Sequence, residues 1–203
     1  VGVYPPSVPY PKPGEPEGVS NRQSSYSYRY DFLHRYIYKK LPERDAIYYI
    51  YDRGSHQVFS QDGEQRARGE WSFSLSDEFS RPVVTGTCHN SYFYEDLQLS
   101  EINVKARRDD TGTAFHGYIP ENITLTTPVV YTVNYYDDYS FIGKHGVPTS
   151  LNYTTPPSGY GTRYTESSKG LLTGTVTARV DATGVTGYDY AAFYYDERGR
   201  IIQ

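Results

Sequence analysis

The segment Tyr195-Asp196-Glu197-Arg198-Gly199-Arg200-Ile201-Ile202-Gln203 predicts a strand, a tight turn and a returning strand. An aspartate at the first position of a turn accepts a hydrogen bond from the backbone two residues on, and a glycine at the fourth position takes a positive φ without a Cβ clash. The residues after the turn, through Ile201 and Ile202, have strand character. The segment therefore indicates a β-hairpin with Asp196, Gly199 and Arg200 as structural turn residues.

Four earlier segments repeat part of this pattern. Each begins at an aspartate, and these are Asp31, Asp52, Asp77 and Asp137. When the segments are aligned on the aspartate, the glycine position holds His34, Ser55, Ser80 and Ser140, and the arginine position holds Arg35, His56, Arg81 and Phe141. The sequence therefore predicts structural turns at all four aspartates, although only the segment at Asp196 carries the complete pattern.

The spacing of the aspartates indicates a repeated unit. The gaps from Asp31 to Asp52 and from Asp52 to Asp77 are 21 and 25 residues, and the next two gaps are 60 and 59 residues. A period of roughly 20 to 25 residues is typical of arrayed structural repeats. The two long gaps indicate insertions or diverged copies of the unit.

The pattern Tyr-Asp-x-x-Gly-Arg at this period resembles the YD repeat of the Rhs family, which teneurins also contain. Segment 51–86, with Ser60-Gln61-Asp62-Gly63 and Arg68-Gly69-Glu70-Trp71-Ser72-Phe73, is similar to Rhs-repeat proteins of the Bacteroidetes type. Segments 169–174 and 194–203 match the same pattern. The resemblance covers roughly residues 26–203 and is weakest over 88–130 and 143–168.

This resemblance implies a structural role. Rhs and YD-repeat chains wrap a long curved β-sheet into a hollow shell, which in toxin members encloses a C-terminal effector. The implied protein is bacterial and lies outside the cell or at its surface, and the implied partners are flanking repeats of the same parent chain, an enclosed effector or a cell-surface glycan. We therefore expect a non-enzymatic shell segment that encloses cargo or contacts other cells.

The composition favours sheet over helix. The 203 residues include 24 Tyr and no Met, and only 37% of the residues are hydrophobic even with Tyr counted. Tyrosine favours strands and sits half buried, with its ring packed and its hydroxyl wet. We therefore expect an all-β chain of antiparallel hairpins in an extended curved sheet, with a second small sheet between residues 88 and 180 and little helix.

The chain divides by composition into three segments. Residues 1–22 contain a proline-rich run that favours extended polyproline II and indicates a linker or strap. Residues 23–88 form the clearest YD-like repeat region. Residues 89–203 form a diverged repeat or insert region, with a long loop over 143–170 and the C-terminal YD repeat.

Individual strands follow from local patterns. Residues 26–30 alternate as a half-buried strand does, and residues 47–51 form a continuous apolar and aromatic run. Trp71, Phe73 and Leu75 alternate with serines, which predicts one buried face with Trp71 as a core anchor. Further strands are expected at 102–107 and 114–119, at 129–136, and at 172–180 and 187–196. A short helical turn near 95–99 is the only helix that we expect.

Charge and hydropathy argue against two classes of partner. The formal net charge is −4 and the basic residues are scattered, whereas nucleic-acid binding proteins usually carry a basic stripe. No stretch approaches 18 consecutive apolar residues, so we expect no membrane insertion. The lone cysteine, Cys88, is expected to be a small buried hydrophobe and not a nucleophile.

No pattern indicates catalysis, a cofactor or a metal. The five histidines lack the spacing of metal ligands, and several fall in or beside predicted turns, where His tolerates unusual backbone angles. The acid pairs Asp137-Asp138 and Asp109-Asp110 could suggest a hydrolase, but the repeat alignment makes Asp137 a turn former. We therefore expect no catalytic residue, no bound cofactor and no metal site.

A carbohydrate-binding module is the alternative function. Exposed tyrosine rings can stack on sugars, and such a site needs two or three coplanar exposed rings with polar groups beside them in a cleft. The candidate ligand-binding residues are Tyr153, Tyr160 and Tyr164 in the long loop. The competing interpretation is that the tyrosines form cross-strand ladders and expose only their hydroxyls.

Overall fold

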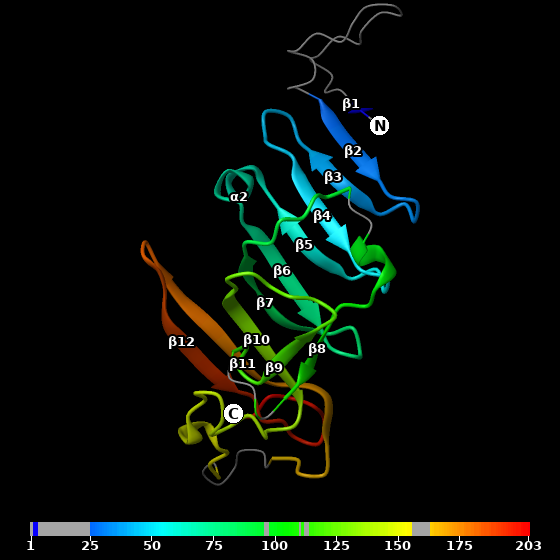
Figure 1. Ribbon diagram of the computed structural model, residues 1–203. Helices are drawn as coiled ribbons and strands as arrows, with labels where there is room; N and C mark the ends of the chain where they lie inside the picture. The colour runs from blue at the N-terminus through cyan, green and yellow to red at the C-terminus, as the bar shows by residue number, and fades with distance from the viewer. Residues whose placement is uncertain (1, 4–24, 96–97, 110, 112–113, 156–162) are drawn as a thin grey trace, which may run out of the picture. The chain divides into compact units, whose positions relative to one another are not determined.

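The computed structural model describes residues 2–3, 25–95, 98–109, 111, 114–155 and 163–203 (Figure 1). These residues fold into two compact units. The first unit contains the described residues up to Phe73 together with Cys88–Asn103, and the second contains Ser74–Thr87 together with the described residues from Val104 onward. The segment predicted as a proline-rich linker lies almost wholly outside the described residues.

The first unit is an antiparallel sheet in which neighbours in sequence are neighbours in space. It starts with the two-residue β1 (Gly2–Val3), which pairs with β2 (Tyr26–Tyr30), followed by β3 (Tyr36–Lys40), β4 (Ile47–Tyr51) and β5 (Gln57–Gln61). The first half of β6 (Trp71–Ser76) pairs with β5. Each connection between these strands from β2 to β5 is a short turn, so the predicted hairpins of this region are present.

The second unit holds two sheets. The larger contains the end of β6, then β7 (Pro82–Cys88), β10 (Val129–Asp137), β11 (Ser168–Asp181) and β12 (Gly184–Ala192), again antiparallel (Figure 1). The smaller pairs β8 (Lys105–Arg108) with β9 (Tyr118–Glu121). The predicted all-β chain of antiparallel hairpins with a second small sheet is thus confirmed.

The chain crosses between the two units three times. The repeat region expected over 23–88 contributes to both units, and the chain passes from one unit to the other after Phe73, Thr87 and Asn103. The reason lies in β6, which pairs with β5 only through Ser72 and Phe73. The remainder of that strand belongs to the second unit.

The alternation of β6 is as predicted. Trp71, Phe73 and Leu75 are all buried, and Trp71 is only 3% exposed. Its ring meets Phe59 edge-on at 6.1 Å between centroids, so Trp71 lies in the core of the first unit. Strand β5 is buried at both Val58 and Phe59, whose side chains point to opposite faces of the sheet, and a covering segment lies over the face of Phe59.

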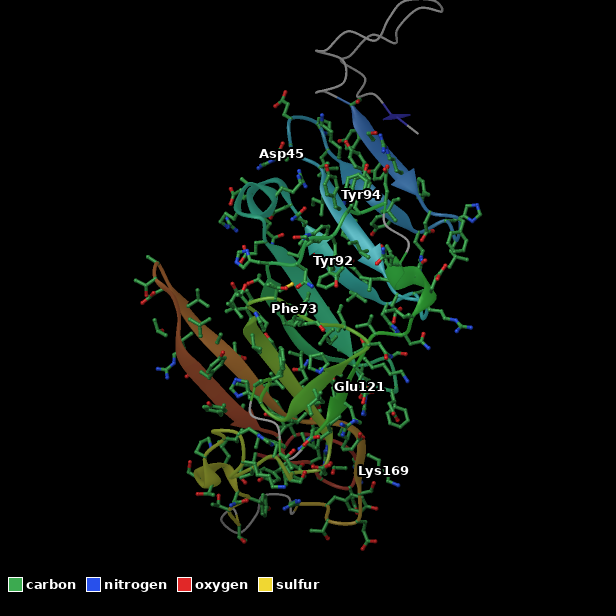
Figure 2. All side chains as sticks on the ribbon, viewed as in Figure 1. Asp45, Phe73, Tyr92, Tyr94, Glu121 and Lys169 are labelled. Atoms are coloured by element: carbon green, nitrogen blue, oxygen red, sulfur yellow. The ribbon has the colours of Figure 1, made fainter. Side chains whose placement is uncertain are left out.

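The covering segment lies at residues 90–95, and its aromatic residues contact the sheet of the first unit. Figure 2 labels Tyr92 and Tyr94 on it. The ring of Tyr92 lies 4.9 Å from that of Phe59, and Tyr94 stacks on Tyr48 at 4.2 Å. Burial raises the pKa of Tyr94 to about 12, so its hydroxyl stays protonated at neutral pH, where it accepts a hydrogen bond from Arg29 (2.9 Å).

The core of the second unit includes an aromatic stack that needs a glycine beneath it. Tyr135 and Phe141 lie parallel, with ring centroids 4.1 Å apart. A Cβ on Gly174 would approach the Phe141 ring to 2.3 Å and the Ala191 carbonyl oxygen to 2.8 Å. Only glycine on β11 therefore lets the ring of Phe141 lie against the strand.

In the described part of the chain, three short helices lie between the strands. The helix α2 (Gly63–Arg68) is not among the predicted elements, which include a helical turn only near 95–99. Its signal was present in the sequence as a capping box: the Asp62 carboxylate accepts from the Gln65 amide, and the Gln65 side chain accepts from the Asp62 amide. The other two are 3₁₀ turns, η1 (Gln98–Glu101), near the turn predicted at 95–99, and η2 (Thr149–Leu151), in the predicted long loop.

None of the helices in the described part of the chain is long and apolar enough to cross a bilayer.

The buried thiol of Cys88 is expected to be unreactive in the folded protein. Its side chain is fully buried, and this burial raises the pKa of the thiol to about 11. At pH 7.5 we expect no labelling by iodoacetamide within an hour, and stoichiometric labelling after denaturation in guanidinium chloride. Mass spectrometry measures both. Rapid labelling of the folded chain would contradict the structural role of this cysteine.

Candidate functional site

The residues singled out by the repeat form four turns of one kind, beginning at Asp31, Asp52, Asp77 and Asp196. We call these the aspartate turns. In each, the aspartate amide donates to the carbonyl oxygen four residues on, at 2.9 or 3.0 Å, and the amide three residues on donates to the aspartate carbonyl, at 3.0 or 3.1 Å. Because the backbone closes identically in all four, the repeated sequence pattern corresponds to a repeated structure.

The aspartate carboxylate holds each aspartate turn together. One oxygen, Oδ1, accepts from the amide of the fifth turn residue at 2.8 to 3.0 Å. The other, Oδ2, accepts from the side chain of that fifth residue. The arginines Arg35, Arg81 and Arg200 each donate from Nε at 2.7 Å, whereas at the Asp52 turn the Nδ1 of His56 lies 3.2 Å away.

The fourth turn residue has a positive φ in every aspartate turn. The values are 61° at His34, 64° at Ser55, 65° at Ser80 and 72° at Gly199. These are the positions that the alignment placed under the glycine. A left-handed backbone costs a residue with a Cβ about 1–2 kcal/mol relative to glycine, so three of the four turns have a strained residue there.

Exchanging residues at this position should change stability in opposite directions. Replacing Gly199 with alanine should lower the free energy of unfolding by about 1 kcal/mol, because alanine is strained at φ 72° even though the space is open. Replacing Ser80 with glycine should raise it by about 0.5 kcal/mol, since relief of strain exceeds the extra entropy of the unfolded chain. Urea denaturation measures both, and effects of the same sign would contradict this account.

The segment at Asp137 does not form the predicted aspartate turn. Asp137 is the last residue of β10, where a bulge interrupts the register with β11, and its own φ is 75°. The local turn is made instead by Asp138, whose Oδ1 accepts from the amide of Ser140 at 2.8 Å. The Asp137 carboxylate is therefore free of its own turn and accepts from the Gly170 amide at 2.6 Å and from Arg81.

The arginine of one turn reaches the Tyr-Asp pair of the neighbouring one. In the first unit, Arg35 Nη1 donates to the Asp52 carbonyl and to Ser55 Oγ, each at 3.1 Å, and its guanidinium lies 4.8 Å from the centre of the Tyr51 ring. In the second unit, Arg81 donates to both carboxylate oxygens of Asp137, at 3.0 and 2.7 Å.

The guanidinium of Arg81 also lies 4.3 Å from the centre of the Tyr136 ring. The tyrosine before the aspartate thus provides a cation–π contact in both cases.

The same tyrosines bond back to the strand that follows the arginine. The Tyr51 hydroxyl donates to the Tyr36 carbonyl at 3.3 Å, and the Tyr136 hydroxyl donates to the Pro82 carbonyl at 3.4 Å. Tyr36 and Pro82 are the residues immediately after Arg35 and Arg81. In both cases the Tyr-Asp pair accepts hydrogen bonds from the arginine of the neighbouring turn, and its tyrosine hydroxyl donates one to the residue after that arginine. Side-chain contacts therefore couple the two hairpins in addition to the hydrogen bonds between strands.

Electrostatics at the turns follow from these bonds. The guanidinium of Arg81 holds the pKa of Asp137 below its ordinary value, and the paired carboxylates raise the pKa of Arg81. At Asp31, burial opposes ionisation, but the hydrogen bonds from Arg35 and the charge of its guanidinium outweigh it and lower the pKa. Folding therefore stabilises the carboxylates of Asp31 and Asp137 in their charged form.

Stability should consequently fall in acid. A carboxyl whose pKa is lowered in the folded state contributes stability above its unfolded pKa, about 3.9, and loses it as the pH falls through the folded pKa. We expect the free energy of unfolding, measured in urea, to decrease between pH 5 and pH 2.5. The decrease should be smaller in the Asp137→Asn variant; an identical pH dependence in both chains would contradict the role of this carboxylate.

An open depression of about 260 Å³ borders the Asp77 turn in the second unit. Its lining residues are Asp77, Glu78, Phe79, Arg81, Ala106, Arg107, Arg108, Tyr118, Tyr136, Asp137 and Asp138. Arg81 pairs with Asp77 and Asp137, and Arg107 pairs with Glu121 at 2.7 Å. In this depression, Arg81 therefore lies between the two aspartates with which it pairs.

Three of the five histidines have a left-handed backbone conformation. His34, His116 and His145 have positive φ, as their positions in turns suggested. His116 packs edge-on against Tyr188 at 4.5 Å, and burial lowers its pKa. Among the residues that the structure describes, no group of three or more His, Cys, Asp or Glu side chains could hold a metal ion.

The candidate sugar-binding tyrosines are not arranged as a platform in the described part of the loop. Tyr153 is half-buried and inclined at 59° to the Tyr194 ring, and its hydroxyl accepts from the Arg163 amide at 3.2 Å. Tyr164 is 42% exposed. Tyr160 lies outside the described residues. The loop thus supplies one exposed ring at a described position, where sugar stacking needs two or three.

Sequence reasoning located the turns but missed the contacts between them. The signal was available, since a tyrosine precedes the aspartate at positions 31, 52, 137 and 196. A turn by itself does not require that tyrosine. Its recurrence points to a partner outside the turn, which the structure identifies as the neighbouring hairpin at Tyr51, Tyr136 and also Tyr195, whose hydroxyl donates to the Leu172 carbonyl at 2.5 Å.

Comparison of the sequence with protein-family models and with curated proteins gave no match.

Proposed function

We propose that this chain is a non-enzymatic structural segment of a secreted or cell-surface Rhs/YD-repeat protein of bacterial origin. It forms part of a β-sheet shell that encloses cargo or mediates contact at the cell surface. Its partners are flanking repeats of the same parent chain, and beyond them an enclosed C-terminal effector or a cell-surface glycan.

The observation that carries the proposal is the coupling of successive hairpins through Tyr-Asp pairs. Arg35 and Arg81 each bond within their own turn and to the next one, and their side chains are only 14% and 21% exposed. Such contacts resist sliding and splaying of adjacent hairpins, which a thin sheet with a small core needs if it is to act as a wall. The polar residues of the repeat thereby serve the fold instead of a reaction.

The pairing of charges also supports a scaffold. In the aspartate turns, one carboxylate oxygen accepts from a backbone amide and the other contacts an arginine or histidine side chain. A catalytic carboxylate must instead face a substrate with at least one oxygen available.

The proposal is tested in the parent protein on intact bacteria. If the segment forms a shell around cargo, the cargo should resist added protease in the intact protein and become sensitive when residues 26–203 are deleted. An Arg81→Leu variant should give partial sensitivity, and the exposed Arg107→Leu a normal result. Cargo that is equally resistant with and without the segment, in a protein confined to the cytoplasm, would contradict the proposal.

A further inference from the structure

The aspartate turn at Asp196 carries an arginine at the same position as the turns at Asp31 and Asp77, but this arginine is far more exposed. The side chain of Arg200 donates to Asp196 Oδ2 from Nε and Nη2, each at 2.7 Å, as Arg81 does to Asp77. Yet Arg200 is 69% exposed, against 14% for Arg35 and 21% for Arg81. Within the described residues, Asp196 is the only side chain that bonds to its guanidinium.

The backbone around Arg200 is arranged like that around Arg35. Tyr195 bridges Ile201 across its turn, as Tyr30 pairs with Tyr36. Ile201 is 60% exposed and stands where Tyr36 and Pro82 stand after their arginines, the two positions whose carbonyls accept a tyrosine hydroxyl from the neighbouring hairpin. Strand β12 pairs only with β11 among the described strands, and beyond its end Tyr194 and Tyr195 pair with the returning segment Ile201–Gln203.

We propose that Arg200 and the Ile201 carbonyl form a docking site for a β-hairpin that turns at a Tyr-Asp pair, supplied by a flanking repeat of the same chain. This inference rests on the proposed function, because it assigns the contact by which a flanking repeat attaches. The tyrosine ring of that hairpin lies under the guanidinium, and its hydroxyl donates to the Ile201 carbonyl. The aspartate offers its main-chain carbonyl, as Asp52 does, or its carboxylate, as Asp137 does.

The recognition is specific in its chemistry. An arginine already held by its own aspartate is fixed in orientation, so its outer nitrogens are pre-organised for an acceptor at one place. The two occupied examples in this chain both combine an aromatic face with an aspartate oxygen. A hairpin with an apolar residue before its aspartate, such as one with leucine there, would lose both the cation–π contact and the returned hydroxyl.

The chain itself supplies the hairpin for a test. Tyr51 lies sixteen residues after Arg35. Appending a copy of residues 39–61 directly after Gln203 places the copied tyrosine sixteen residues after Arg200, so that the new hairpin has the natural spacing. Hydrogen exchange followed by NMR, with only the appended segment isotopically labelled, then measures how firmly the hairpin is docked on the full chain.

We expect the appended amides to be protected and Arg200→Gln to reduce their protection about tenfold, since a hydrogen bond to a charged group contributes about 1.5 kcal/mol or more. The matched control is Arg198→Gln, the neighbouring exposed arginine of the same turn, which should leave protection unchanged. Tyr51→Leu in the appended copy alone should also reduce protection. The loss in the double variant should be smaller than the product of the two single effects, because both substitutions remove the shared cation–π contact.

Independent, multiplying effects of the two substitutions would overturn the proposal, because Arg200 would then act only on its own turn. An appended segment that exchanges freely in the unsubstituted chain would overturn it as well. Protection that rises with protein concentration would assign the hairpin to a second copy and contradict docking within one chain. None of these outcomes alters the aspartate turns of the unextended chain, so the scaffold proposal is tested separately.

Discussion

Replacing Asp52 with alanine should lower the free energy of unfolding by about 2 kcal/mol, because it leaves partly buried donors of His56 without their acceptors. The Asp52 side chain is only 1% exposed. Its carboxylate accepts from the His56 amide at 2.8 Å and lies 3.2 Å from His56 Nδ1. Alanine removes both acceptors while water cannot readily replace them, and urea denaturation followed by tryptophan fluorescence measures the loss.

Two further variants separate the turn from general effects of the substitution. Asp52→Asn keeps one acceptor oxygen and should lose about half as much stability. Asp45→Ala removes an exposed aspartate of the same unit, and should be neutral within about 0.5 kcal/mol. Equal denaturation midpoints for Asp52→Ala and the unsubstituted chain would show that Asp52 does not form its turn.

Replacing Arg81 with leucine should lower the free energy of unfolding by about 2–3 kcal/mol. Arg81 lies between Asp77 and Asp137 and bonds to both carboxylates. These two side chains are 14% and 33% exposed, so removing the cation leaves two partly buried like charges without a partner. Hydrogen bonds to charged groups contribute about 1.5–3 kcal/mol each. Breaking a fully buried ion pair costs about 3–5 kcal/mol, and the expected loss here is smaller because both aspartates are partly accessible to solvent.

The matched control is Arg107→Leu in the same unit. Arg107 is 51% exposed and also pairs with two acids, Asp109 and Glu121, but exposed ion pairs contribute less than about 1 kcal/mol. Arg81→Lys should lie between the two, because lysine cannot donate in parallel to both Asp137 oxygens. A loss for Arg81→Leu no greater than that for Arg107→Leu would contradict the coupling between the hairpins.

Much of the local structure could be predicted from the sequence. The aspartate turns, the positive φ at the fourth residue and the buried face of Trp71, Phe73 and Leu75 depend on contacts within a few residues or on strict alternation. The helix α2 is equally local, since its capping box at Asp62 and Gln65 lies within four consecutive residues, but the strand patterns on either side of it drew the prediction away from a helix. These features depend on the chemistry of neighbouring residues, which is visible in one chain.

The amino-acid order by itself determined where this chain turns, since an aspartate carboxylate and a left-handed residue three positions later close each turn locally. Only the tertiary structure decided which side chains of one turn contact the neighbouring turn. Arg81 lies 56 residues from Asp137 in sequence, and the bulge in β10 places Asp137 outside the predicted turn and opposite that arginine. Such a contact depends on which strands become neighbours, and that is set by the packing of the whole sheet.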